Sequence, residues 1–246
     1  MSVFNDYARY YDLLYQDKDY EGEAAYVVKQ LKHYFPDAIS LLELGSGTGK
    51  HADLFARAGY ELVGVESSEE MVYQARKRNP NITFHHGDLR EITMGRVFDV
   101  ALALFHVISY QTTNQDLLEA FKAARLHVKD GGGIIFDCWH GPAVLHQRPE
   151  VRVKRLEGQG MSVIRIAEPE LDTAHSTVTV NYQMLVQENS QRYEIKEKHK
   201  MRYLFQPELE MILEISGFHL VHSEEWMTGR EPGSDTWGVL HIARAI

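Results

Sequence analysis

The sequence predicts an α/β fold that carries an antiparallel β insertion near its C-terminal end, and two observations lead to this prediction. In the first two thirds of the 246-residue chain, short apolar runs alternate with longer amphipathic stretches, which is typical of β/α units. From about residue 147 onward, β-branched or alternating segments are separated by the turn-prone stretches GQG, TAH and ENSQ. A chain with 44% hydrophobic residues can bury a full core as one domain, or as one domain with an insertion.

The first two thirds predict five strands connected by helices. Pro36 ends the first amphipathic stretch, Gly59 closes the second, and Ser67 with Glu70 has the spacing of a capping box at the start of the third. Any helix between the third and fourth strands must be short, because few residues join them. The predicted strands are 40–44, 61–66, 81–88, 98–106 and 133–139, and the predicted helices are 19–35, 51–59, 67–79 and 114–128.

The remaining third predicts four antiparallel strands, a last helix and two last strands. Pro207 opens the last helix and Gly217 closes it, so the antiparallel strands form an insertion between the fifth strand and this helix. The two final strands are expected in FHLVHSEEW and TWGVLHIARAI. The four strands of the insertion are expected in VRVKRLE, MSVIRIAEPELD, STVTVNYQMLVQE and RYEIKEKHKMRYL.

The composition favours a small-molecule partner. A formal net charge of −9, without a long Lys/Arg run, argues against binding to nucleic acid. Cys138 is the only cysteine, so no intramolecular disulfide can form, and the N-terminal MSVFNDYARYYD has no secretory signal pattern. The longest apolar stretches, such as VALALF, are too short to span a bilayer. We expect a cytoplasmic protein that binds neither nucleic acid nor a membrane.

The stretch LLELGSGTGK, residues 41–50, joins a predicted strand to three glycines at every second position. Gly45, Gly47 and Gly49 would bring bare backbone to the carboxyl edge of a parallel sheet, where open α/β folds bind ligands. This spacing differs from the dinucleotide fingerprint G-x-G-x-x-G. The structural alternative is a tight turn between a strand and a helix.

Three acids are predicted to lie near the same edge of the sheet. Glu43 precedes the glycines, Glu66 ends the second strand and Asp88 ends the third. A carboxylate at the end of the second strand can accept both hydroxyls of a ribose. Three neighbouring carboxylates repel phosphate, so they suit a nucleoside that carries amino and hydroxyl groups, together with a cation.

Five motifs in this order resemble those of the class I S-adenosylmethionine-dependent methyltransferases: LLELGSGTG, VGVESSEEMVYQARKR, FHHGDLRE, FDVALALFHVISY and KDGGGIIFD. The N-terminal YARYYDLLYQDKDYEGEA and the β insertion further resemble bacterial N-methyltransferases of nucleotide-linked amino deoxysugars. The resemblance implies a Rossmann-like, seven-stranded, mostly parallel sheet with helices on both faces and one antiparallel strand. The matching motifs cover residues 1–140 and 204–246, the expected core, and leave residues 141–203 as an insertion that is expected to bind the acceptor. The strands of the insertion are rich in Val, Ile and Tyr and must cover one face, so we also expect the insertion to form a homodimer.

The resemblance also implies roles for individual residues toward S-adenosyl-L-methionine. Gly45, Gly47 and Gly49 would pass beneath its methionine portion, with Glu43 holding the loop or the amino group. Glu66 would bind the ribose hydroxyls. The other implied contacts are Asp88 and Leu89 to the adenine, Leu104 to the methionine side, and Tyr15 and Tyr20 closing over the cofactor and the transferring methyl. For the two tyrosines the alternative is an ordinary surface helix whose rings pack on the core.

Methyl transfer to an amine needs alignment and removal of a proton, not a nucleophilic side chain. His106 leaves the fourth strand at its carboxyl end and is the candidate base, although a structural histidine bonded to a loop carbonyl is an equal alternative. Trp139 and His140 could line the acceptor site or pack at the strand end. His85 and His86 point to opposite faces of a strand, so we expect no metal site.

The most basic stretch has two interpretations. Arg148, Arg152, Lys154 and Arg155 could form a solvated strand edge, or a clamp for the phosphates of a nucleotide-linked acceptor. The leading functional hypothesis is a small-molecule methyltransferase that acts on an amine such as an amino sugar. The alternatives are an O-methyltransferase, an oxidoreductase that binds a nicotinamide dinucleotide, and a cofactor-binding module without turnover.

Overall fold

The computed structural model describes residues 6–158 and 160–246. Residues 1–5 and residue 159 lie outside the described residues. The first of these belong to the predicted core and to the N-terminal stretch searched for a signal pattern, and residue 159 belongs to the predicted turn GQG. Within the described part of the chain, no helix is both long and apolar enough to cross a membrane.

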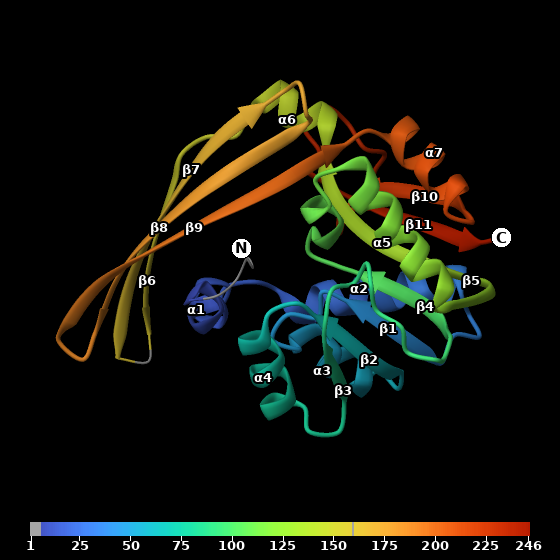
Figure 1. Ribbon diagram of the computed structural model, residues 1–246, viewed down its shortest axis with the longest axis horizontal. Coiled ribbons are helices and arrows are strands. Elements are labelled where there is room, and N and C mark those ends of the chain that lie inside the picture. Colours follow the sequence, from blue (N-terminus) through green and yellow to red (C-terminus); the bar gives the residue numbers. More distant parts are fainter. Residues whose placement is uncertain (1–5, 159) are drawn as a thin grey trace.

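The predicted seven-stranded core sheet is confirmed (Figure 1). Its first five strands are mutually parallel, and the sixth position is taken by a strand antiparallel to both neighbours, as the fold class requires. The order across the sheet is β3 (Thr83–His86), β2 (Glu61–Glu66), β1 (Ser40–Leu44), β4 (Phe98–Ala103), β5 (Val128–His140), β11 (Gly238–Ala245) and β10 (Phe218–Glu225).

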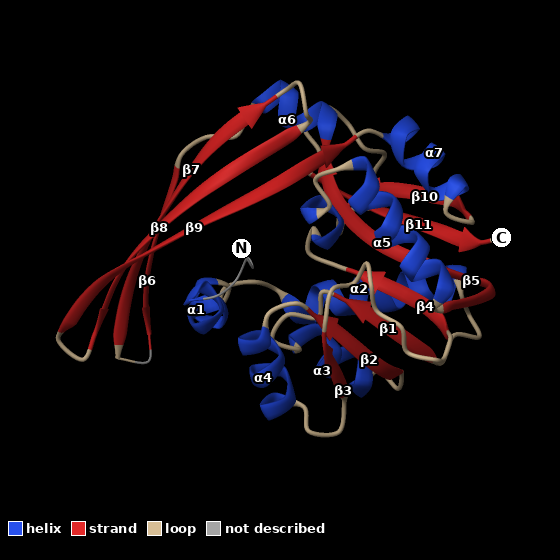
Figure 2. Ribbon diagram, viewed as in Figure 1, coloured by secondary structure: helices blue, strands red, loops and turns tan. Residues whose placement is uncertain are grey.

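Helices cover both faces of this sheet (Figure 2). On one face, α5 (Asn114–Leu126) and α7 (Gln206–Ile215) bury Phe121 and Leu213 against the strands. On the other face, α2 (Tyr20–Tyr34), α3 (Lys50–Arg57) and α4 (Glu69–Arg78) bury Leu31, Phe55 and Val72. Within a helix the buried residues recur at helical spacing, as Ala24, Val27 and Leu31 do in α2, which places one apolar stripe against the sheet.

The start of α4 corrects one prediction. Ser68, and not Ser67, is the N-cap residue, and its side chain accepts a hydrogen bond from the backbone of Met71 at 3.4 Å. The reason is that Ser67 directs its hydroxyl to Glu66, so the helix begins one residue later than the sequence spacing suggests.

The insertion forms four long antiparallel strands, β6 (Arg152–Gly158), β7 (Met161–Asp172), β8 (Thr177–Glu188) and β9 (Gln191–Leu204). They are continuous with the core, because the end of β9 pairs in parallel with the end of β5 at Trp139–Tyr203 and His140–Leu204. A short helix, α6 (Gly141–Gln147), precedes them and was not expected. Figure 1 shows the four strands extending away from the core as a twisted ribbon. The boundaries of the insertion as a unit remain a prediction.

The N-terminal helix α1 (Asp6–Leu14) lies between the insertion and the core. Leu13 and Leu14 pack into a hydrophobic cluster with residues of β6 to β9. Lys154 donates to the Leu14 carbonyl at 2.9 Å and to Asp17 at 2.6 Å. Asp12 accepts from the Thr48 hydroxyl at 2.8 Å and pairs with Arg78 on the core side. These contacts join α1 to both parts of the protein.

Candidate functional site

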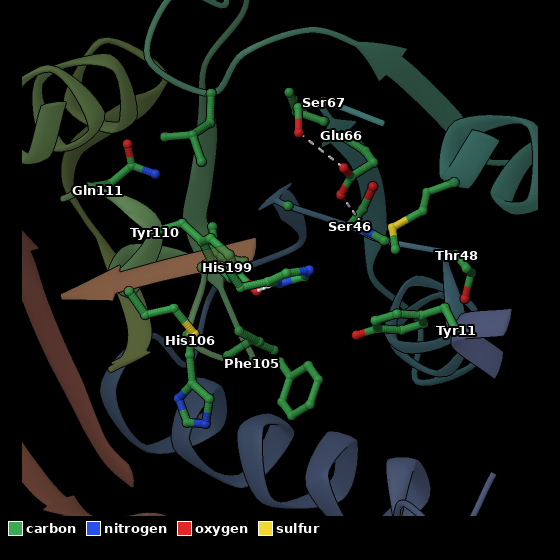
Figure 3. Close-up of a pocket in the computed structure, with 18 of the residues that line it drawn as sticks. Tyr11, Ser46, Thr48, Glu66, Ser67, Phe105, His106, Tyr110, Gln111 and His199 are labelled. Carbon is green, nitrogen blue, oxygen red and sulfur yellow. Dashed lines mark hydrogen bonds between the residues drawn. The ribbon is translucent and has the colours of Figure 1, made fainter. Parts of the chain in front are cut away.

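A cavity of about 550 Å³ opens at the carboxyl edge of the core sheet, with α1 and the insertion on its other sides. Figure 3 shows Glu66 and Ser67 on one side of it, Phe105 and His106 on another, and Tyr110 next to His199. Of the predicted site residues, Glu43 and Gly49 do not line the cavity. Those that do line it are Tyr15, Tyr20, Gly45, Gly47, Glu66, Asp88, Leu89, Leu104 and His106.

The glycine loop exposes bare backbone to this cavity. Gly45, Gly47 and Gly49 all have left-handed backbones, with φ of 72°, 54° and 74°. A Cβ added at Gly45 would lie 2.5 Å from a methyl of Val107, whereas at Gly47 nothing lies within 4 Å. A side chain at Gly47 would therefore fill open space in the cavity, where a ligand can approach the backbone instead.

Glu66 ends β2 as predicted, and its carboxylate holds the glycine loop. It accepts from the backbone N–H of Gly47 at 3.0 Å and of Ser68 at 2.8 Å, and from the Ser67 hydroxyl at 3.3 Å. Burial raises the pKa of Glu66, and these donors oppose the rise. The carboxylate is thus positioned by backbone groups at the edge of the cavity.

Three buried polar atoms near the loop have no hydrogen-bond partner within the described residues: Oε2 of Glu43, Oγ of Ser46 and the hydroxyl of Tyr20. Ser46 and Tyr20 line the cavity, and Glu43 lies behind the loop. Burial, followed by the charge of Glu66, raises the pKa of Glu43 to about 8. Unsatisfied acceptors and donors of this kind fit the amino and carboxylate groups of an amino-acid moiety, such as the methionine portion of S-adenosylmethionine.

Asp88 lies at the end of β3, and its carboxylate is paired with a neighbouring arginine. Arg90 donates to it through Nε at 2.9 Å and through its backbone N–H at 2.9 Å, which holds the pKa of Asp88 below its usual range. Arg90 also contacts Asp116 of α5. The predicted contact of Asp88 with an adenine amino group stays a prediction.

His106 lies in a strained turn that one buried acid holds in place. Phe105 and His106 both have φ of 64°, an uncommon backbone for residues other than glycine. Asp137, only 2% exposed and three residues before the end of β5, accepts from the His106 N–H at 3.1 Å. Its Oδ2 lies 2.6 Å from His106 Nδ1, but Nδ1 makes no hydrogen bond within the described residues. Burial alone would raise the pKa of Asp137, but the His106 imidazole and N–H keep it below its usual range.

Tyr15 closes the cavity from the side of α1. Its ring meets the Phe105 ring edge-on at 5.1 Å between centroids, and Tyr11 lies 4.7 Å away. Nearby, the Lys18 ammonium lies 4.2 Å from the Phe105 ring centroid and 4.6 Å from that of Tyr20, and it pairs with Glu23. These contacts give the two predicted tyrosines a place at the cavity, and their roles remain predictions.

The insertion wall is the side of the cavity lined by Tyr110, Trp139, Tyr182, His199 and Met201, with the neighbouring Lys198 and Lys200. The sequence predicted that the insertion faces the acceptor and that Trp139 could line its site, but it singled out none of the other residues of this wall. Tyr110 belongs to a single 3-10 turn, η1 (Val107–Tyr110), and the others come from β5, β8 and β9. The alternating pattern of the strand gave no reason to predict that His199, rather than one of its neighbours, is a site residue. Asp137 was not predicted either, because it lies within an apolar strand.

Other predicted features lie away from this cavity. His140 does not line it, and neither do Arg148, Arg152, Lys154 and Arg155. Lys154 binds the N-terminal segment, so it is not available as part of a phosphate clamp in this arrangement. Within the residues that the structure describes, no group of three or more His, Cys, Asp or Glu side chains is placed to hold a metal ion.

Known proteins resemble this chain in sequence and in fold. Residues 41–132 match a family model described as a methyltransferase domain. The dTDP-3-amino-3,4,6-trideoxy-alpha-D-glucopyranose N,N-dimethyltransferase of Streptomyces venezuelae is 28% identical over 227 residues, covering 92% of this chain and 95% of that protein. The dTDP-3-amino-3,6-dideoxy-alpha-D-glucopyranose N,N-dimethyltransferase of Streptomyces fradiae is 30% identical over 177 residues, 71% of this chain and 69% of that protein.

The crystal structure of DesVI from Streptomyces venezuelae superimposes with a TM-score of 0.84. It is 25% identical in sequence, and the match covers 99% of this chain and 100% of that chain. The likeness therefore includes the insertion as well as the core sheet.

The pKa of Glu43 predicts a pH dependence of stability. Because burial raises this pKa from 4.5 to about 8, the folded protein favours the protonated carboxyl. This contribution is fully present below pH 4.5 and is lost as the pH rises through 8, so the ligand-free protein should lose a few kcal/mol of unfolding free energy over that range. The Glu43→Gln variant should lose less. Calorimetric melting from pH 5 to 9 measures both, and parallel curves for the two proteins would contradict the assignment.

Proposed function

This chain belongs to the S-adenosylmethionine-dependent methyltransferases, and we propose that it transfers a methyl group to the amino group of a nucleotide-linked deoxysugar. The observation that carries the proposal is one cavity that combines an exposed glycine loop, an acid at the end of β2 and an imidazole held by a buried carboxylate. The names of the two Streptomyces relatives, both amino-sugar N,N-dimethyltransferases, support the acceptor class.

The cofactor side of the proposal uses the glycine loop and its acids. The backbone of Gly47 would lie against the cofactor, and Glu66 would accept hydrogen bonds from the ribose hydroxyls. Glu43, behind the loop, would interact with the amino group of the methionine portion. Asp88, Leu89, Leu104 and Tyr20 would complete the contacts. When bound, S-adenosylmethionine supplies an electrophilic methyl group. The chain contributes alignment and the exclusion of water.

The acceptor side of the proposal uses His106. An amine is protonated near neutral pH and cannot attack until it loses a proton. The negative charge of Asp137 Oδ2, which lies 2.6 Å from Nδ1 although the two are not aligned for a hydrogen bond, favours the tautomer whose hydrogen is on Nδ1, and this leaves the lone pair of Nε2 to receive a proton. The same base would serve a hydroxyl acceptor, so an O-methyltransferase is the second candidate. The relatives' names favour nitrogen.

The remaining features of the proposal concern organisation. The insertion, residues 141–203, would bind the small-molecule acceptor and contribute to a homodimer. A cytoplasmic location remains a prediction from composition.

A methyl-transfer assay tests the acceptor class. The purified protein, with S-adenosylmethionine, should methylate the two dTDP-amino sugars named for the Streptomyces relatives, and mass spectrometry should detect products heavier by one or two methyl groups. The matched controls are the same nucleotide sugars with a hydroxyl in place of the amine. Methylation of the hydroxyl compounds alone would favour the O-methyltransferase, and no methylation of any compound would reject the proposed acceptor class.

Replacing Glu66 tests the proposed ribose contact. Glu66→Ala should remove two hydrogen bonds to the ribose and weaken S-adenosylmethionine binding by about 2 to 4 kcal/mol, taking each hydrogen bond to a charged acceptor at roughly 1.5 to 3 kcal/mol and allowing for partial rescue by water. Calorimetric titration gives the affinity. Ser67→Ala is the control, because it removes the weakest donor to Glu66, at 3.3 Å, and keeps the carboxylate. An unchanged affinity in Glu66→Ala would falsify the ribose assignment.

Replacing His106 separates proton removal from positioning. His106→Ala should lower turnover by about 10² to 10⁴, with little change in cofactor affinity, if the imidazole takes the proton. A loss of about tenfold or less would mean that His106 only positions the acceptor.

Tyr15→Phe is the companion variant, since it keeps the ring that meets Phe105 and removes only the hydroxyl. The measurement is turnover against pH for the wild type and both variants. A limb of the wild-type profile that disappears in His106→Ala supports the base. A limb that persists in that variant assigns the titration to another group.

A further inference from the structure

Three polar side chains form a continuous chain along the insertion wall. The Tyr110 hydroxyl lies 2.8 Å from Nδ1 of His199, and Nε2 of His199 lies 3.1 Å from a carboxylate oxygen of Glu197. Tyr110 comes from η1 at the end of β4, and the other two come from β9 in the insertion. Tyr110 and His199 both line the cavity, and Figure 3 shows them next to each other.

The position of the His199 ring is fixed by its surroundings. The residue is only 2% exposed, and the rings of Tyr110 and Tyr182 meet it at 5.9 Å and 4.9 Å between centroids. Both contacts are close to edge-on, with interplanar angles of 63° and 87°. A buried ring packed between two aromatic rings holds each nitrogen toward one partner.

The chemistry of the three groups sets the direction of the hydrogen bonds. An ionised carboxylate only accepts, so Glu197 requires a hydrogen on Nε2 of His199. In the neutral imidazole, Nδ1 then has only a lone pair, and the Tyr110 hydroxyl must donate its single hydrogen to it. A phenol whose hydrogen is committed can interact with further groups only as an acceptor.

We propose that Glu197 and His199 fix the Tyr110 hydroxyl as a hydrogen-bond acceptor in the cavity. Tyr110 would then select those methyl-accepting substrates that present an N–H or O–H group to its oxygen. This inference rests on the proposed function and assigns a specificity-determining residue of the same site. Tyr110 would contact the acceptor molecule directly. His199 and Glu197 are positioning residues, because they act through Tyr110.

A purely structural role would also explain a bond between η1 and β9, so the test needs a measurement that depends on the direction of the bonds. Nitrogen-15 NMR of the histidine side chains at about pH 8, where an ordinary imidazole is neutral, distinguishes the two tautomers. The His199 signal is identified by its loss in His199→Gln. We expect the hydrogen on Nε2 in the wild type, and a larger share on Nδ1 in Glu197→Gln, whose amide can donate to Nε2. A hydrogen on Nδ1 in the wild type would overturn the proposal.

Kinetics with the dTDP-amino sugars supply the second measurement. Tyr110→Phe should raise KM for the amino sugar about tenfold, the loss of one hydrogen bond, with kcat changed less than about threefold. Glu197→Gln should raise KM similarly, and should add nothing in the Tyr110→Phe background. The control is Tyr26→Phe, which removes a phenol bonded to the Glu224 carboxylate outside the cavity lining and should leave KM unchanged.

Two kinetic outcomes would overturn the proposal: an unchanged KM in Tyr110→Phe, or a further rise when Glu197→Gln is added to it. Failure of the proposed function looks different, since the wild type would then methylate none of the nucleotide sugars. The NMR measurement needs no acceptor and decides the direction of the bonds in either case.

Discussion

The contact between Asp137 and the turn at Phe105–His106 is the interaction on which the rest of the site depends. Two consecutive residues other than glycine with positive φ cost about 1 to 3 kcal/mol each, so such a turn persists only where its surroundings determine it. Asp137 does this from β5, where it accepts from the His106 N–H and lies against the imidazole. A backbone shape that local sequence disfavours is thereby held by a tertiary contact, and the side chains that leave the turn acquire fixed directions.

The side chains that leave this turn and the following η1 contact three parts of the protein. Phe105 points toward the N-terminal segment, where its ring meets Tyr15 and the Lys18 ammonium. The chain then continues into η1, whose Tyr110 reaches His199 of the insertion. The core sheet, the N-terminal segment and the insertion therefore all contact residues 105–110. The cavity is therefore shaped by side chains from distant parts of the sequence that meet beside this turn.

The sequence predicted the parts of the site that follow from sheet geometry, and it missed those that depend on contacts between elements. Gly45, Glu66 and Asp88 were found because parallel strands end at a common edge, so chemistry at strand ends gathers there. Asp137 could not be found in this way, since an acid in an apolar strand has no local partner. The short elements α6 and η1 carry no periodicity, and His199 lies in a strand whose polar residues alternate like any other. Arg90, two residues from Asp88, was a partner that local spacing could have revealed.

The buried acids at the glycine loop and at His106 differ in how the protein surrounds their charge. Glu66 is surrounded by backbone donors that favour its charged form, whereas an oxygen of Glu43 has none, so burial dominates at Glu43 and raises its pKa to about 8. The edge of the sheet thus holds one acid at which backbone donors oppose the effect of burial on the pKa, and another with an oxygen that has no donor. A positively charged group bound near Glu43 would favour the ionised form that the protein alone disfavours, and the coupling would strengthen binding of a cation. At His106 the arrangement differs, because the buried carboxylate of Asp137 has the imidazole 2.6 Å from its Oδ2 and the His106 N–H as a donor. The buried acid behind the glycine loop therefore has one oxygen without a protein partner, whereas the buried acid at His106 is partnered by the turn that it holds.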